Sequence, residues 1–197
     1  MKKQYTTIIV VGFIAFFVLL AFGKNMSIKI KPGERGILFR QFAKVPLNKD
    51  NIYTPGFHLF APWNEMIVYD VKEQKSEETM DVLSKNGLSI NVDVSIRFNP
   101  LYDRIGYLHE TFGMRYTQTL IVPEVRSSVR KVMGRYTTEE IYSTKRKEVE
   151  DEIITETGKR LLENNIRMKA LLIRSINLPK QIKQAIENKL KEEQVAL

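Results

Sequence analysis

Cysteine is absent from this chain of 197 residues, and histidine and tryptophan are scarce, with two copies and one copy. Without cysteine the chain forms no disulfide and no thiolate metal site, although this absence says nothing about its redox compartment. His58 and His109 lie far apart, and neither has other ligand residues at a metal-binding spacing. We therefore expect no metal site.

The motifs of the common enzyme classes are also missing. The chain has no G-x-S-x-G, no Walker A sequence, no G-x-G-x-x-G and no H-E-x-x-H. Its adjacent acidic pairs, such as Glu77-Glu78 and Asp151-Glu152, lie in charged contexts and not in an apolar cleft that would shift a pKa. We therefore expect no catalytic residue, no cofactor and no enzymatic activity.

The chain carries a formal net charge of +8. Its densest basic group is Arg126, Arg130, Lys131 and Arg135, which has no regularly interleaved aromatic residues and matches no nucleic-acid-binding motif. We interpret this group as the solvated face of a helix, with contact to lipid headgroups or to an acidic partner as the alternative. We expect no nucleic-acid partner.

Near its start the chain has an uninterrupted apolar run, Thr6 to Phe22, flanked by lysines. As a helix these 17 residues reach roughly 26 Å, slightly less than a bilayer core of about 30 Å. Tyr5 and the flanking lysines extend that reach by lying at the interface, which favours a retained signal anchor. The alternative is a signal peptide, since Ala21 and Gly23 resemble a cleavage site. The flanking charges leave the side of the following domain open.

The strongest local pattern is a β-hairpin. One arm runs from Met66 to about Val82, Asn86-Gly87 forms a type I′ turn, and the second arm covers Leu88 to Phe98. On the second arm apolar and polar residues alternate strictly, which predicts one buried face and one wet face. The predicted core residues are Leu88, Ile90, Val92, Val94, Ile96 and Phe98, and the predicted wet ones are Ser89, Asn91, Asp93, Ser95 and Arg97.

From Leu101 the apolar spacing becomes helical. We expect helices over about 101–112, over 116–134 with Pro123 as a bend or boundary, and from Ser143 or Thr144 to about Asn164. Thr137 to Glu140 has the pattern of a capping box. A strand follows over 167–176, and Pro179 begins a last helix in which Ile182, Ile186 and Leu190 recur every fourth residue.

A polar loop is expected at Asn48 to Asn51, before a segment that is bracketed by prolines, Tyr53 to Trp63. Its prolines confine it to an edge strand or a loop. Its aromatic residues Phe57, Phe60 and Trp63 have two interpretations. They form part of the core at the strand ends, or, together with Tyr5, they lie at a membrane interface, where aromatic rings are enriched.

The order of these segments resembles a known family. The segments are Pro32–Ile37, Pro55–Trp63, the Asn86-Gly87 hairpin with Asn91–Phe98, Pro123–Arg126 with Arg130, and Leu178-Pro179 followed by Ala185–Lys189. Together they are similar to a prohibitin of the SPFH superfamily, which comprises stomatin, prohibitin, flotillin and their relatives. The resemblance covers nearly all of 24–197.

The resemblance implies an α+β fold in which an antiparallel sheet packs against helices. It divides the chain into a signal-anchor transmembrane segment (1–23), an SPFH domain (24–178) and the start of a C-terminal coiled-coil helix (179–197). It also implies a single pass through the cytoplasmic membrane. Its expected partners are membrane lipids, copies of the same chain in a ring or cage, and an FtsH-type AAA protease.

The function implied by the resemblance is that of a non-enzymatic scaffold that organises membrane and regulates the protease. Two alternatives remain: a secreted or periplasmic binding domain after signal cleavage, and a membrane-tethered enzyme. The family's long coiled coil begins where this chain ends, so we expect the chain to assemble weakly through its last helix. An apolar seam of a few turns is short for a stable coiled coil.

Overall fold

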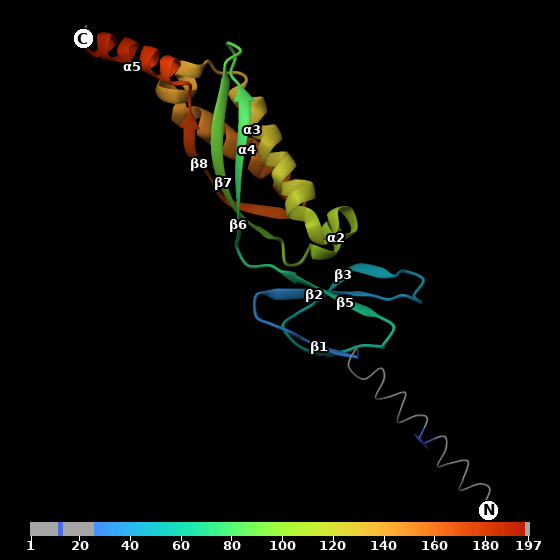
Figure 1. Ribbon diagram of the computed structural model, residues 1–197. Helices are drawn as coiled ribbons and strands as arrows, with labels where there is room; N and C mark the ends of the chain where they lie inside the picture. Colours follow the sequence, from blue (N-terminus) through green and yellow to red (C-terminus); the bar gives the residue numbers. More distant parts are fainter. Residues whose placement is uncertain (1–11, 14–25, 196–197) are drawn as a thin grey trace, which may run out of the picture. The chain divides into compact units, whose positions relative to one another are not determined.

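The computed structural model describes residues 12–13 and 26–195 (Figure 1). The predicted signal anchor, including Tyr5, lies outside the described residues except for Gly12 and Phe13, which are helical. Within the described parts, no helix has both the length and the apolar character to cross a membrane.

The described chain forms two compact units. The first, unit 1, contains the chain up to Lys72 together with Tyr102–Glu110, and the second, unit 2, contains Glu73–Leu101 and the chain from Thr111 onward. The chain therefore passes between the units three times, after Lys72, after Leu101 and after Glu110. The range 24–178 that the sequence predicts as the SPFH domain is divided between both units, and the last helix, beyond that range, belongs to unit 2.

Unit 1 consists of short antiparallel strands. They are β1 (Ser27–Ile30), β2 (Glu34–Phe39), β3 (Leu47–Tyr53), β4 (Gly56–Leu59) and β5 (Glu65–Asp70). β1 pairs with β4, while β2 lies between β3 and β5 in a second sheet. The polar loop expected at Asn48–Asn51 is wrong, because these residues lie within β3. That strand is an edge strand, where polar side chains can face water without cost.

The core of unit 1 is closed by helix α2 (Ile105–Phe112), most of which belongs to this unit. Ile37 and Tyr69 from the sheet and Ile105 and Leu108 from the helix are each at most 1% exposed. The predicted start of this helix at Leu101 is wrong. The N–H of Leu101 instead donates to the Asn165 carbonyl, and the following residues form a turn.

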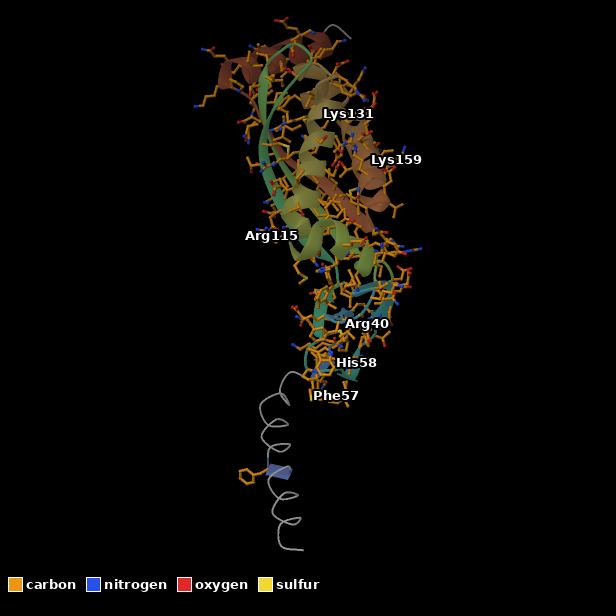
Figure 2. All side chains as sticks on the ribbon, turned by 90° about the vertical axis from the view of Figure 1, so that its right-hand side faces the viewer. Arg40, Phe57, His58, Arg115, Lys131 and Lys159 are labelled. Carbon is orange, nitrogen blue, oxygen red and sulfur yellow. The ribbon has the colours of Figure 1, made fainter. Side chains whose placement is uncertain are left out.

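Unit 2 has a three-stranded antiparallel sheet with helices on one of its faces (Figures 1 and 2). The sheet order is β6-β7-β8. Its strands are β6 (Gln74–Leu83), β7 (Ser89–Pro100) and β8 (Ile166–Asn177). Its helices are α3 (Val122–Met133), α4 (Arg146–Glu163) and α5 (Lys180–Val195), with shorter helical turns η2 (Gly113–Arg115), η3 (Thr117–Ile121) and η4 (Glu140–Thr144). These elements confirm the predicted α+β class.

The hairpin of β6 and β7 confirms the predicted core face. Its apolar residues Ile90, Val92, Val94, Ile96 and Phe98 are all at most 1% exposed, whereas Leu88 is half-buried. The predicted wet position Ser95 is wrong, because its side chain is only 6% exposed. β7 is the central strand, and Ser95 lies between Glu77 of β6 and Leu172 of β8.

Two further details of the hairpin differ from the prediction. The first arm is not one strand: β5 ends at Asp70 in unit 1, and β6 starts at Gln74 in unit 2. The turn is also not type I′, since Gly87 has a φ of 78° but Asn86 does not have a positive φ. The Gly87 N–H donates to the Ser84 carbonyl, and the Ser84 N–H donates to the Leu88 carbonyl. This is a three-residue loop with a left-handed glycine, a common alternative to the two-residue turn.

In unit 2, two of the predicted features of helix starts agree with the structure and one does not. α3 starts at Val122, with Pro123 in its first turn, where a missing N–H costs nothing. The capping box is confirmed, because the Thr137 N–H donates to Glu140 Oε2 at 2.8 Å and the Glu140 N–H donates to Thr137 Oγ1 at 3.3 Å. The cap predicted at Ser143 or Thr144 is wrong. Both residues lie in η4, and α4 starts after Lys145 without a side-chain cap.

Helix α5 contacts other residues of unit 2. Ile186 is 8% exposed, and the Lys189 ammonium lies 2.9 Å from both carboxylate oxygens of Glu139. The predicted stripe of Ile182, Ile186 and Leu190 therefore has its central member already buried within the chain. The side chain of Leu190 lies outside what the structure describes.

Candidate membrane-contacting surface

The strand pairings of unit 1 gather several strand ends at one place. The end of β2 at Phe39 lies opposite both the start of β3 at Leu47 and the start of β5 at Glu65. The start of β1 at Ser27 lies opposite the end of β4 at Leu59. Residues 60–64 join the end of β4 to the start of β5, so the two sheets share this end of unit 1.

Large apolar side chains are exposed around these strand ends. We call them the apolar end: Phe42 (77% exposed), Leu59 (72%), Phe57 (67%), Val45 (59%) and Trp63 (55%). They come from β4, from the segment that follows it and from the loop between β2 and β3. Figure 2 shows Phe57 on unit 1, with Arg40 on the same unit.

Members of the apolar end lie close to one another in pairs. The rings of Phe42 and Trp63 have their centroids 6.2 Å apart and are tilted by 57°. Phe57 and Leu59 lie on the same side of β4, two positions apart, and the chain from Leu59 to Trp63 spans at most about 14 Å. Contiguous exposed apolar groups of this kind mark contact surfaces for membranes or proteins.

The structure shows which of the predicted aromatic residues are exposed, while their contact with a membrane stays a prediction. Phe57 and Trp63 are exposed, whereas Phe60 is half-buried, with its backbone N–H donating to the Met26 carbonyl. Sequence reasoning missed Phe42, Val45 and Leu59. No local signal in the sequence separates Phe42 and Val45 from residues of the core.

Both histidines have local partners. The His58 ring bonds the Thr54 carbonyl at 2.7 Å, and its plane stands edge-on to the ring of Tyr53. His109 Nδ1 lies 2.7 Å from the Tyr69 hydroxyl. Within residues 12–13 and 26–195, no cluster of three or more His, Cys, Asp or Glu side chains is arranged to hold a metal ion.

Unit 2 has a groove of about 690 Å³ lined by residues of α3, α4 and η4. Several of the charged groups that line it are bonded to neighbouring side chains. Arg135 bonds Glu152 at 3.4 Å, and the Tyr136 hydroxyl donates to Glu148 at 3.1 Å and to Glu152 at 2.9 Å. Burial and these two carboxylates raise the pKa of Tyr136. A tyrosine held protonated between carboxylates is a structural donor, because it is neither a base nor a nucleophile at neutral pH.

The basic group that stands out in the sequence is largely neutralised within unit 2. Arg126 bonds Glu78 of β6 at 2.8 Å, Lys131 bonds Glu156 of α4 at 2.7 Å, and Arg135 bonds Glu152. These contacts hold α3 against the sheet and against α4. The group is therefore chiefly a set of ion pairs between elements, which agrees with the interpretation as a solvated helix face.

Comparison with known proteins defines the class to which this fold belongs. The model of the SPFH domain / Band 7 family matches residues 28–197. The chain therefore belongs to the SPFH domain / Band 7 family.

Within that family the chain is similar to prohibitins, as its sequence pattern indicates. It is 23% identical to prohibitin-1, mitochondrial, of Arabidopsis thaliana over 186 residues, which cover 93% of this chain and 62% of that protein. It is also 23% identical to mitochondrial prohibitin complex protein 1 of Caenorhabditis elegans over 166 residues, which cover 83% of this chain and 58% of that protein.

A bacterial relative is similar over the same region. The chain is 28% identical to protein HflC of Buchnera aphidicola subsp. Schizaphis graminum over 206 aligned positions, which cover 94% of this chain and 66% of that protein. The chain thus spans about 62% of the length of the Arabidopsis prohibitin.

Proposed function

We propose that this chain is a non-enzymatic membrane scaffold that contacts the bilayer through the apolar end of unit 1. The observation that carries the proposal is the exposure of Phe42, Phe57, Leu59 and Trp63 at one end of a small unit. Aromatic rings with aliphatic neighbours favour the interfacial zone of a bilayer. The similarity to prohibitins supports a scaffold rather than an enzyme.

The short distance along the chain between the apolar run and unit 1 supports the same membrane contact. Ser27 is paired with Leu59, and five residue steps separate Ser27 from Phe22, the last residue of the apolar run. Those five steps span at most about 18 Å. If 1–23 is a retained anchor, then Ser27 lies within that distance of the point where the anchor leaves the bilayer core, and Leu59 lies about 5 Å further, across the strand pair. The anchor and the apolar end thus form two parts of one membrane attachment, in the cytoplasmic membrane.

We also propose that copies of this chain assemble with one another and associate with an FtsH-type AAA protease. The name of the Caenorhabditis relative places that protein in a prohibitin complex, and the resemblance to prohibitins supports both partners. Size measurement in mild detergent tests self-assembly, and crosslinking in native membranes tests the protease. Repeated recovery of other partners without such a protease would leave a scaffold of another kind.

The single tryptophan of the chain provides the test of membrane contact, because Trp63 belongs to the apolar end. The full chain is reconstituted in vesicles whose acyl chains carry bromine, which quenches tryptophan fluorescence at short range. We expect quenching relative to unbrominated vesicles and a blue-shifted emission. Emission from Trp63 that stays unquenched and water-like would overturn the proposed contact.

The secreted alternative differs in the fate of 1–23. Mass spectrometry of the mature protein decides between them. An intact N-terminal segment supports the anchored scaffold, and a new N-terminus at about Lys24 supports a secreted or periplasmic binding domain.

A further inference from the structure

We propose that the apolar end of unit 1 selects anionic lipid headgroups, through Arg40 and Lys44 in the loop between β2 and β3. This inference rests on the proposed membrane contact and adds the chemical class of lipid. The loop reads Arg40-Gln41-Phe42-Ala43-Lys44-Val45-Pro46, so that its two cations alternate with its two exposed apolar side chains.

The first observation is that these two cations have no acidic partner. Among the residues that the structure describes, neither Arg40 nor Lys44 forms an ion pair or a side-chain hydrogen bond. Glu65 lies opposite Phe39 at the same end of the sheet and forms no ion pair with either of them within that part of the chain. Within the described part of the chain, no ion pair neutralises their positive charge.

Several other cations of the chain form ion pairs. Lys49, only five positions beyond Lys44, bonds Glu110 at 2.8 Å. The basic residues Arg126, Lys131 and Arg135 of unit 2 are paired in the same way. Other cations of unit 2, such as Arg146 and Lys147, also lack an ion pair within the described residues, so what distinguishes Arg40 and Lys44 is their place in the same short loop as the exposed Phe42 and Val45.

The second observation is that the loop has a defined shape. The Arg40 N–H donates to the Pro46 carbonyl at 2.8 Å, which closes the loop at its base, and the Ala43 N–H donates to the Arg40 carbonyl at 3.2 Å. Phe42 is fixed further by its ring contact with Trp63. The loop therefore has a defined backbone, in which Arg40 and Lys44 each lie two positions from Phe42.

The occupant that fits this surface is a bilayer containing anionic phospholipid. Aromatic and aliphatic side chains enter the interfacial zone, and the lysine and arginine heads remain at the level of the phosphates. A cation near such a surface strengthens association about fivefold. Arg40 and Lys44 together should therefore raise the ratio of membrane-bound to unbound loop by a factor on the order of 25 at low salt.

The test uses Trp63 quenching in vesicles in which the phosphatidylcholine is brominated and the phosphatidylglycerol content is 0, 10 or 30 mol%. For the full chain we expect quenching to rise with phosphatidylglycerol and to fall again in 0.5 M salt. The double variant Arg40→Gln/Lys44→Gln should lose this dependence. The matched control Arg146→Gln/Lys147→Gln removes two exposed charges from α4 of unit 2 and should behave as the parent chain.

The outcomes separate this inference from the proposed function. Quenching that is equally strong in neutral and anionic vesicles would overturn the headgroup selectivity and leave the membrane contact in place. Quenching in neither would overturn the contact itself. A loss of dependence in the control variant would attribute the effect to net charge and not to this loop. Circular dichroism checks that each variant is folded.

Discussion

The backbone of Gly106 in α2 lies directly against the backbone of Lys49 in β3. A Cβ placed on Gly106 would lie 2.6 Å from the Lys49 Cα and closer still to the carbonyl oxygen. Around this contact the Tyr107 hydroxyl donates to Asp50 at 2.8 Å, and Lys49 bonds Glu110. The close approach of helix and strand is therefore what allows these side chains to meet.

Gly106→Ala should destabilise unit 1, because the obstacle is backbone and cannot rotate away. Overpacking of this kind costs about 1–3 kcal/mol, and a forced backbone shift adds to it. Hydrogen exchange of β3 and α2 measures the change locally. Gly158→Ala is the control: its Cβ would meet only the flexible end of Met168 at 3.2 Å, and alanine favours the helix. Equal protection in both variants would contradict this prediction.

Val94→Asp should destabilise unit 2 by several kcal/mol or force the new carboxyl to stay protonated, because Val94 is 1% exposed on the central strand. Ser89→Asp, at the exposed start of the same strand, should change the free energy of unfolding little. Ser95→Asp should also destabilise, since Ser95 is buried next to Glu77. Chemical unfolding followed by circular dichroism measures all three, and a silent Ser95→Asp would restore the wet face that the sequence alone predicts.

Glu140→Gln should lower stability at neutral pH. Bonding to the Thr137 N–H, and then to Lys145, lowers the pKa of Glu140 from 4.5 to about 2. Because the folded pKa is depressed, the stabilisation is present above pH 4.5 and is lost as the pH falls toward 2. The gap between parent and variant should close over that range. Asp151→Asn, on the exposed side of α4, should show no such gap.

His109 should make unit 1 less stable in mild acid. Burial lowers the pKa of His109 below its ordinary 6.5, with Glu65 opposing that effect. The unfolded chain therefore binds the proton first, so the stabilisation is complete above pH 6.5 and disappears as the pH falls through the folded pKa. His109→Gln should flatten the dependence between pH 7.5 and 5, a range above that in which Glu140 titrates.

Tyr69→Phe separates burial from hydrogen bonding at this histidine. It removes the 2.7 Å bond to His109 but keeps the aromatic ring in the core. Because burial is the main cause of the lowered pKa, the pH dependence should persist in Tyr69→Phe while overall stability falls by about 1 kcal/mol. A flattened pH dependence would instead assign the effect to the hydrogen bond.

The sequence predicts this fold best where one local pattern decides the structure. The alternation of Ile90, Val92 and Val94 identifies β7, and the Thr137–Glu140 spacing identifies a helix start, because each depends on neighbours within a few residues. The family resemblance covers the rest of the topology. Ser95 could not be placed in this way, since its burial depends on β8, which lies far along the chain.

The candidate membrane-contacting surface could also be predicted only in part from the sequence. Phe57 and Trp63 stand out in the sequence as aromatic residues between prolines, but nothing local distinguishes an exposed ring from a buried one. The contact between Phe42 and Trp63 arises because β2 and β5 are paired, which brings together residues that no short pattern connects. That Arg40 and Lys44 form no ion pair within the described residues, although Glu65 lies opposite the neighbouring Phe39, depends on three-dimensional position and cannot be read from the sequence.

The threefold passage of the chain between its units has a consequence for synthesis. Ile37 and Tyr69 belong to unit 1, but helix α2, which completes the core of this unit, begins at Ile105, after the whole of β6 and β7 has been made. While the chain emerges from the ribosome, the inner face of the first sheet stays uncovered until more than thirty further residues have been synthesised. The apolar end and the unfinished core are then exposed together, so early contact with the bilayer would protect the nascent chain from aggregation.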